Sequence, residues 1–314
     1  MPVYVARRLA LVLLTLLVSS AVIFMVTQVL PGDAARAILG RFATPQALAN
    51  LREKLGLDRP LILQYGSWLV RYVHGDWGIS LSTGESVFKL VAGRLRNSAM
   101  LALVAFLMYV PLGILLGLFS ALRQGKLSDQ IISITSLAFI GLPEFVTGLV
   151  LIALFALRLN WLPASSDIRP DAGFLEALPR LILPGITVSL VSLAYITRMT
   201  RSSTSQVLAT DYIRSAYLKG LRPLRVMFVH VLRNSLLPTV TVIAVGIGWL
   251  IGGLIVTESL FGYPGLGRLL LFAIQRRDLP LLQAITLLLV VVFSLSNLLA
   301  DIIYALLNPR IRYT

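Results

Sequence analysis

Long apolar runs alternate with shorter polar segments along this chain. Most runs are roughly 20 residues long, the length at which a helix crosses about 30 Å of hydrocarbon. The first covers Leu9–Leu30 and is too long for the apolar core of a cleaved signal peptide, so we expect a retained helix. The pattern predicts an all-α polytopic membrane protein with six transmembrane helices, near residues 9–30, 98–121, 131–157, 179–199, 236–257 and 281–307.

The charges between the spans predict how the chain is oriented. Arg7 and Arg8 precede the first span, Arg123 and Lys126 follow the second, and the tail after the sixth is also basic. The loop at 158–178 is rich in acidic residues. Because short cytoplasmic loops carry an excess of Lys and Arg, both termini are predicted to be cytoplasmic, in a multi-pass protein of the bacterial inner membrane.

A polar segment at residues 31–97 separates the first two spans and contains two predicted surface helices. One begins after Thr44-Pro45 and ends at Gly56, and the other begins at Asp58-Arg59-Pro60. Aromatic residues on one side of the second helix fit either a position near the lipid headgroups or a packed extracytoplasmic cap. We therefore divide the chain into residues 1–97, a first helix with a long extracytoplasmic segment, and residues 98–314, a five-helix core with a cytoplasmic loop at 200–236.

That cytoplasmic loop is the most distinctive polar stretch. Residues 198–238 carry seven Lys or Arg and one acid, Asp211. We expect Asp211 to cap a short helix over 212–219, Gly220 to end it, and Pro223 to open a second helix toward Leu232. Ser215 and Ala216 are expected to be exposed, as a small-residue knob that fits a groove on another protein.

Composition excludes several other classes of protein. The chain is 57% hydrophobic and only 13% charged, against about a quarter charged in soluble domains. Its net charge of +14 follows from the positive-inside rule, so no nucleic-acid partner is expected. There is no Cys, and the two His lie outside the apolar runs, which disfavours a metal site or an intramembrane protease. The chain has no G-x-x-x-x-G-K-[ST] phosphate-binding loop, so we expect a transport subunit and not an enzyme.

The spacing Arg214-Ser215-Ala216-x3-Gly220-x9-His230-x-Leu232 resembles the E-A-A-x3-G-x9-I-x-L-P signature of ABC-importer permeases. Arg214 stands where that signature has Glu, Ser215 replaces its first Ala, and Arg233 stands where Pro is usual. Four further stretches resemble the B-type permease subunits of the peptide/nickel branch, and together they cover essentially the whole chain: LREKLGLDRPL (51–61), HGDWGISL (74–81), TESLFGYPGLGRLL (257–270) and NLLADIIYALLNPRIR (297–312).

The resemblance implies a type I importer fold and a set of partners. It implies a second permease subunit forming a heterodimer, two cytoplasmic ATPases and an extracytoplasmic substrate-binding protein, all working at a lipid bilayer. No cofactor is expected on this chain, with ATP and Mg bound by the ATPases. The residues expected to couple to an ATPase are Asp211, Arg214, Ser215, Ala216, Tyr217, Lys219, Gly220 and Leu221.

Candidate gate or pathway residues lie in and near the other spans. Glu144 is either a polar point on the substrate route or an acid that reaches water or pairs with a neighbour. Asp301 is expected to pair with an Arg of the tail or of the coupling loop. The resemblance places the Gly-rich turn after Glu258 in a re-entrant plug near an outer gate, with a plain loop as the rival interpretation. The remaining candidates are Pro143, Gly262, Pro264 and Gly265.

A stand-alone secondary transporter or channel is the alternative function. It would need intramembrane ionisable groups, for which only Glu144 and Asp301 are candidates. Within the resembling branch the substrates include dipeptides, oligopeptides, nickel and glutathione, so the sequence leaves the substrate open.

Overall fold

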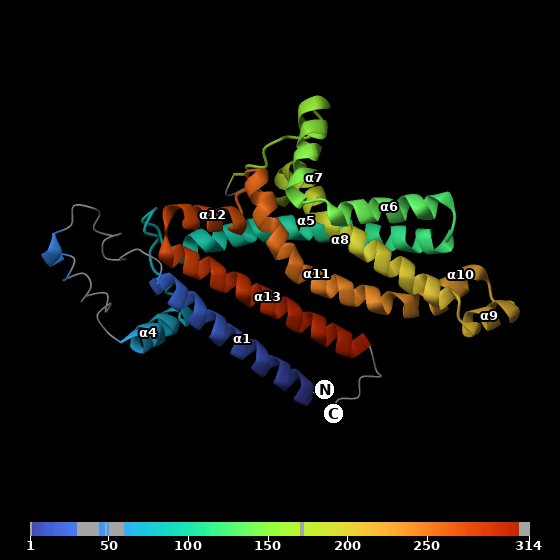
Figure 1. The fold of residues 1–314 in the computed structure, drawn as a ribbon, viewed down its shortest axis with the longest axis horizontal. Coiled ribbons are helices and arrows are strands. Elements are labelled where there is room, and N and C mark those ends of the chain that lie inside the picture. The colour runs from blue at the N-terminus through green and yellow to red at the C-terminus, as the bar shows by residue number, and fades with distance from the viewer. Residues whose placement is uncertain (1, 30–43, 48, 50–59, 170–172, 308–314) are drawn as a thin grey trace.

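The computed structural model describes residues 2–29, 44–47, 49, 60–169 and 173–307, and nearly all of them are helical. Figure 1 shows an elongated bundle in which most long helices run obliquely along the long axis. Within the described residues, five helices are long and apolar enough to cross a membrane, and six if one bent pair counts as a single span. The predicted all-α fold with six spans is therefore confirmed.

The predicted spans fall inside longer helices. The structure extends the second span to begin at Val87 and not at Ser98, because Val87 and Val91 are buried against Leu266 and Leu281. Packing between distant segments thus adds three turns that hydropathy alone does not predict. The spanning helices are α1 (Pro2–Val29), α5 (Val87–Leu122), α8 (Phe174–Leu208), α11 (Leu232–Leu260) and α13 (Leu279–Leu307), with the bent pair described below.

Shorter elements connect the spanning helices. The amphipathic helix α4 precedes α5, and α12 lies between α11 and α13 (Figure 1). Two short helices and a π-helical turn join α8 to α11, the last running without interruption into α11. The bounds of these elements are α4 (Leu61–Val73), α9 (Asp211–Leu218), α10 (Pro223–Arg225), η2 (Val226–Val231) and α12 (Leu266–Arg276).

The third span differs from the single helix predicted over 131–157. It consists of α6 (Leu127–Gly141) and α7 (Glu144–Leu151), the latter continued by the π-helical segment η1 (Ile152–Arg158), and the two halves are bent by 110°. Pro143 accounts for the break, because it lacks an amide hydrogen and disfavours helical geometry at the residue before it. Leu142 accordingly has an extended backbone, with φ −88° and ψ 130°.

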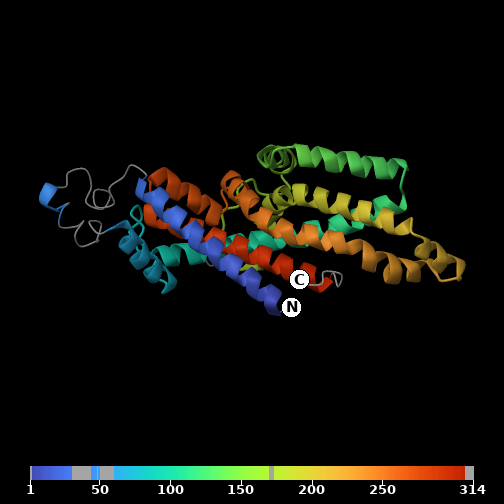
Figure 2. The same cartoon turned by 60° about the horizontal axis from the view of Figure 1, so that its bottom comes forward.

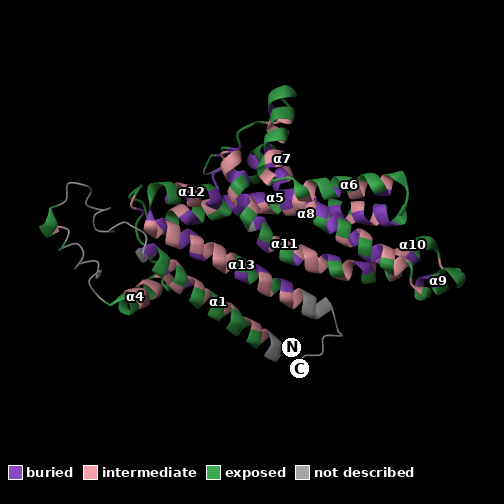
Figure 3. Cartoon of the chain, in the orientation of Figure 1, coloured by how far each residue is buried: buried purple, intermediate pink, exposed green. Residues whose placement is uncertain are grey.

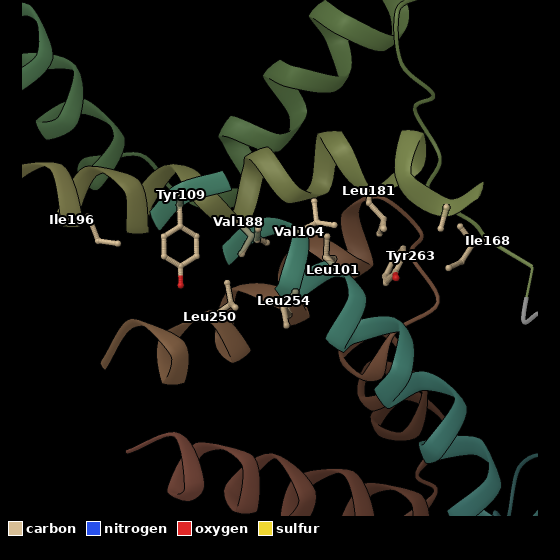
Figure 4. Close-up of a cluster of buried hydrophobic side chains, with 12 residues drawn as sticks. Leu101, Val104, Tyr109, Ile168, Leu181, Val188, Ile196, Leu250, Leu254 and Tyr263 are labelled. Carbon is tan, nitrogen blue, oxygen red and sulfur yellow. The ribbon is translucent and has the colours of Figure 1, made fainter. Parts of the chain in front are cut away.

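The centre of the bundle depends on a close approach between α5 and α8. A Cβ at Gly113 would lie 2.7 Å from Ile196, and one at Gly117 would lie 2.5 Å from Thr200. Two glycines four residues apart lie on one helix face, so the backbones can approach as in other membrane helix pairs. Figure 4 shows side chains of the adjoining core, which include Leu101, Val104, Tyr109, Ile168, Leu181, Val188, Leu250, Leu254 and Tyr263.

The second predicted surface helix is present as α4, whereas the first, after Thr44, lies mostly outside the described residues. Helix α4 packs on α1. The Tyr65 hydroxyl lies 2.8 Å from that of Ser20, and the rings of Trp68 and Phe24 are 5.7 Å apart. These contacts pack α4 against the first span, and its position relative to the lipid headgroups stays a prediction. The proposed division at residue 97 stays a prediction.

The ends of α1 and α13 are joined by an ion pair. Arg8 Nη1 lies 2.7 Å from Asp301 Oδ2. The sequence predicted an Arg of the tail or of the coupling loop as the partner of Asp301, and the described structure instead pairs it with the first span. The reason is that α13 runs back beside α1, which brings two residues distant in sequence together (Figure 1).

Candidate functional site

The loop between α8 and α11, residues 209–231, forms a protruding structure that we call the coupling segment. Figures 1 and 2 place α9 at one end of the long axis of the molecule, while α12 lies toward the opposite end. Thr210 is the N-cap of α9, and Asp211 lies in its first turn, so the predicted cap at Asp211 is wrong by one residue. An acid in that turn still interacts favourably with the helix dipole. The predicted turn at Gly220 is confirmed by its φ of +72°.

The coupling segment has a small apolar core of its own. Ile213 and Ala216 of α9 are buried against Val226 and Val231 of the following elements, and Leu221 packs on the same cluster. Ala216 is only 7% exposed, so the prediction that it forms part of an exposed knob is wrong. Ala216 lies three residues after Ile213, on the same inward face of the helix.

The outward face of the coupling segment combines apolar and basic side chains. Leu218 is 81% exposed and Leu224 is 73% exposed. Figure 3 shows α9 mostly in the colour of exposed residues. Exposed leucines inside a rim of positive charge are typical of a surface that binds another protein with acidic groups around an apolar pocket. Further exposed residues of the segment include the basic Arg214, Lys219, Arg222 and Arg225, together with Asp211, Ser215, Tyr217 and Phe228.

Hydrogen bonds fix α9 to the start of α11. The Tyr212 hydroxyl donates to the backbone oxygen of His230 at 3.2 Å and accepts from Asn234 Nδ2 at 2.9 Å. Asn234 also donates to the His230 oxygen, at 3.0 Å. The sequence pattern did not indicate the roles of Tyr212 and Asn234, or the exposure of Leu218 and Leu224. The helical spacing of Ile213 and Ala216 could have indicated which face of α9 points outward.

At the opposite end, the Gly-rich turn after α11 closes over a buried carboxylate. Glu258 is fully buried and accepts hydrogen bonds from the Ser98 hydroxyl, from the Gly267 amide at 2.6 Å and from the Arg268 amide at 3.3 Å. A Cβ at Gly265 would lie 2.2 Å from the Glu258 carboxyl group. The turn therefore needs Gly at this position to make room for the acid. The hydropathy pattern placed Glu258 just after the fifth span, in an outer loop, and gave no sign that its carboxylate is buried.

The same turn is tied to the beginning of the second predicted span. Asn97 Nδ2 donates to the Pro264 oxygen at 2.8 Å, and the Tyr263 hydroxyl donates to the Asn97 oxygen at 2.7 Å. Gly262 has φ +66°, which suits the tight turn that the sequence predicted. Pro264 and Gly265 are both buried. The described turn is therefore packed into the bundle, and its role in a gate stays a prediction.

Glu144 lies directly after the break in the third span. Its carboxylate accepts a hydrogen bond from the Thr257 hydroxyl of α11, and a Cβ at Gly253 would lie 2.7 Å from Glu144 Oε2. Pro143 is the exposed N-cap of α7. The structure thus brings Glu144 against the C-terminal part of α11, where it has a hydrogen-bonded neighbour. A role of Glu144 on the substrate route stays a prediction.

A second buried acid holds the loop before α5 against the start of α13. Asp278 is fully buried, and its Oδ2 atom accepts from the hydroxyls of Ser80 and Ser82, both at 2.5 Å, and from the Ser82 amide at 3.0 Å. Burial alone would raise the pKa of the Asp278 carboxyl, but these hydrogen bonds outweigh it and leave the pKa below its ordinary value. The loop therefore stays attached through an ionised carboxylate.

These features define a class of protein: a polytopic helical membrane protein with an exposed apolar and basic surface at one end and a tightly packed turn at the other. The chain belongs to the family of binding-protein-dependent transport system inner membrane components, whose sequence profile matches residues 113–313, while the N-terminal profile of the same systems matches residues 1–102. As the resemblance predicted, it is a multi-pass permease subunit of an ABC importer.

Similar proteins align with this chain over their full length. The probable peptide ABC transporter permease protein y4tP of Sinorhizobium fredii is 37% identical over 313 residues, with all of both chains covered. The di/tripeptide transport system permease protein DppB of Pseudomonas aeruginosa is 39% identical, covering 99% of this chain and 98% of that protein. The dipeptide transport system permease protein DppB of Escherichia coli is 36% identical with the same coverage.

A solved structure supports the fold. A chain of the MetNI methionine ABC transporter, in an inward-facing conformation, superposes with a TM-score of 0.50. The match covers 71% of this chain and 96% of that chain at 16% sequence identity. The likeness concerns the helix arrangement only.

Proposed function

We propose that this chain imports di- or oligopeptides across the bacterial inner membrane, as one of two different permease subunits. Three relatives that align with this chain over 98–100% of their own length are named for peptide, di/tripeptide or dipeptide transport, and they are 36–39% identical to it. A relative from Salmonella choleraesuis named for glutathione transport is 35% identical, and glutathione is itself a small peptide. A peptide substrate is the chemistry that these names share.

The observation that carries this proposal is the exposed face of the coupling segment. Leu218 and Leu224 would insert into an apolar pocket of a cytoplasmic ATPase, and Arg214, Lys219 and Arg222 would face acidic side chains around it. Two such ATPases would bind ATP and Mg, one on this chain and one on the second permease. This chain would bind no cofactor and hydrolyse nothing, since it carries no phosphate-binding loop.

The orientation follows from the same assignment. With the coupling segment in the cytoplasm, α11 crosses outward, and the turn after Glu258 and α12 lie at the extracytoplasmic face. Helix α13 then crosses back, which puts both termini in the cytoplasm. This agrees with the basic residues before the first span and after the last span. An extracytoplasmic binding protein would deliver peptide at the α12 end.

Replacing exposed leucines of the coupling segment with acids tests the ATPase contact. Leu218→Asp and Leu224→Asp should each lower ATPase copurification at least tenfold, because a buried carboxylate is unfavourable in an apolar pocket. Leu127→Asp, at the 72% exposed first residue of α6, is the matched control and should leave copurification unchanged. Normal copurification of both coupling-segment variants would contradict the assignment.

Uptake of a radiolabelled dipeptide into proteoliposomes tests the transport proposal. The complete system should take up peptide only with ATP and with the binding protein present. Peptide uptake by the purified chain without ATP would instead support the stand-alone transporter. A complete system that hydrolyses ATP yet takes up no di- or oligopeptide would contradict the proposed substrate class.

A further inference from the structure

A buried ion pair joins three helices near the coupling segment. Arg201 of α8 donates to Asp129 of α6 through Nε at 2.5 Å and Nη2 at 2.8 Å. The same carboxylate accepts from the Ser120 hydroxyl of α5 and from the Gly125 amide at 2.9 Å. Both carboxylate oxygens are therefore saturated by donors from α5, from the turn that follows it and from α8.

The geometry of this pair is that of a rigid link. Asp129 is only 3% exposed, whereas the Arg201 side chain is 31% exposed. A two-pronged contact between guanidinium and carboxylate fixes orientation as well as distance. Removing one partner would leave the other charge partly buried without compensation, so the arrangement is stable only while both are present.

The pair lies between the coupling segment and the contact of Glu144 with Thr257. Arg201 lies seven residues before Leu208, the end of α8, which is about two turns from the coupling segment. Asp129 lies in the first turn of α6. The 15 residues of α6 span about 22 Å and end at the break before Pro143. Beyond that break, Glu144 contacts Thr257 near the outer end of α11.

We propose that Asp129 and Arg201 are positioning residues that make the α5–α6 turn and the cytoplasmic end of α8 move as one body. A displacement of the coupling segment would then shift α6 along with α8. The movement of α6 would then reach the 110° bend between α6 and α7, and α7 contacts α11. This inference rests on the proposed function, because it takes the coupling segment as the place where an ATPase acts.

Loss of the pair should reduce the efficiency of coupling and not assembly. In the complete transporter in proteoliposomes, Asp129→Asn and Arg201→Gln should each lower peptide uptake per ATP hydrolysed about tenfold, while ATPase copurification is retained. The double variant should be no worse than either single variant, because both remove the same contact. Lys126→Gln, which removes a positive charge from the exposed N-cap of α6, is the control and should keep the wild-type ratio.

The outcome separates this role from a merely structural one. Uptake and ATP hydrolysis that fall in the same proportion, or loss of copurification, would show that the pair only stabilises the fold, and an unchanged ratio would show that it transmits nothing. A wild-type transporter that hydrolyses ATP but moves no peptide would overturn the proposed substrate. The distance measurement described next would still test whether Asp129 and Arg201 form a rigid link.

A distance measurement tests the rigid link without transport. The chain contains no Cys, so when it is labelled before assembly with its partners, spin labels attach only to introduced cysteines at the exposed Gln130 of α6 and Ser202 of α8. In the complete transporter the label distance should be narrow and equal with and without a non-hydrolysable ATP analogue. With Asp129→Asn it should broaden or shift. A wild-type distance that changes with nucleotide, or a variant that leaves it unchanged, would overturn the proposal.

Discussion

The Glu258 carboxylate occupies the space that a side chain at Gly265 would need, because a Cβ there would lie 2.2 Å from it. Gly267 is under a similar restriction, since its Cβ would lie 2.4 Å from the backbone of Ile255. The acid and the two glycines therefore form one structural unit, in which the small residues let the turn close and the amide of Gly267 donates to the acid. The Gly-rich composition of this turn has a packing cause.

We expect Gly265→Ala to destabilise the protein by about 1–3 kcal/mol, since an added methyl group would overpack a buried site formed by backbone and a fixed carboxyl group. Gly252→Ala is the matched control, because a Cβ at Gly252 meets nothing within 4 Å. Thermal unfolding of the detergent-solubilised chain measures both. The prediction fails if the two variants unfold at the same temperature.

Changes at the two neighbouring small residues of α9 should affect different properties, namely the stability of the coupling segment and its affinity for the ATPase. Ala216→Leu should destabilise the coupling segment, because Ala216 is buried against Ile213 and Val226. Ser215→Leu, on the exposed face, should leave the fold intact and alter only ATPase affinity. Limited proteolysis of the coupling segment reports the first effect, and copurification reports the second. Equal protease sensitivity of the two variants would contradict the structure.

Gly220→Pro should uncouple ATP hydrolysis from peptide uptake while leaving the chain inserted in the membrane. Gly220 has φ +72°, and the proline ring fixes φ near −65°, so the turn between α9 and α10 could not keep its shape. Simultaneous assay of ATP hydrolysis and uptake measures the coupling. Gly75→Pro is the control, because it imposes the same strain at φ +85° in the turn after α4, outside the coupling segment, and should keep the wild-type ratio. Normal uptake per ATP by Gly220→Pro would refute the assigned role.

The stability provided by Asp278 should depend on pH. Its pKa is lowered in the folded chain, so the ionised form stabilises the fold above the unfolded-state pKa of about 3.9. This stabilisation is lost as the pH falls through the lower folded-state pKa. Asp278→Asn should therefore reduce the unfolding temperature at pH 7, and the difference from wild type should shrink at acidic pH.

The control for this prediction is Glu85→Gln, at an exposed acid in the loop that Asp278 holds. That variant should follow wild type at both pH values. A difference between Asp278→Asn and wild type that is constant down to pH 3 would mean that the side-chain shape, and not its charge, holds the loop.

Much of the fold could be predicted from the sequence, because a span must be apolar over a length set by the bilayer. The run over 281–307 predicted α13 within two residues, and the run over 9–30 predicted the end of α1 within one residue, although α1 begins seven residues earlier, at Pro2. The Gly220 turn and the helix before it were also predicted, since Gly favours a positive φ at a helix end. Pro143 was only a candidate for a bend within one continuous span, and the 110° break there was not predicted, because proline is ordinary in membrane helices and only packing decides whether one kinks or breaks.

The sequence by itself determined the class of protein, the number of spans and the site of the protruding basic loop, since hydropathy and charge act locally along the chain. Only the tertiary structure decided which acids are buried and which residues they contact. Glu258, Asp278 and Asp129 are neighbours of residues 9 to 198 positions away, and no local pattern specifies those contacts. Burial and pairing of charge depend on how the helices pack, which is a property of the whole chain.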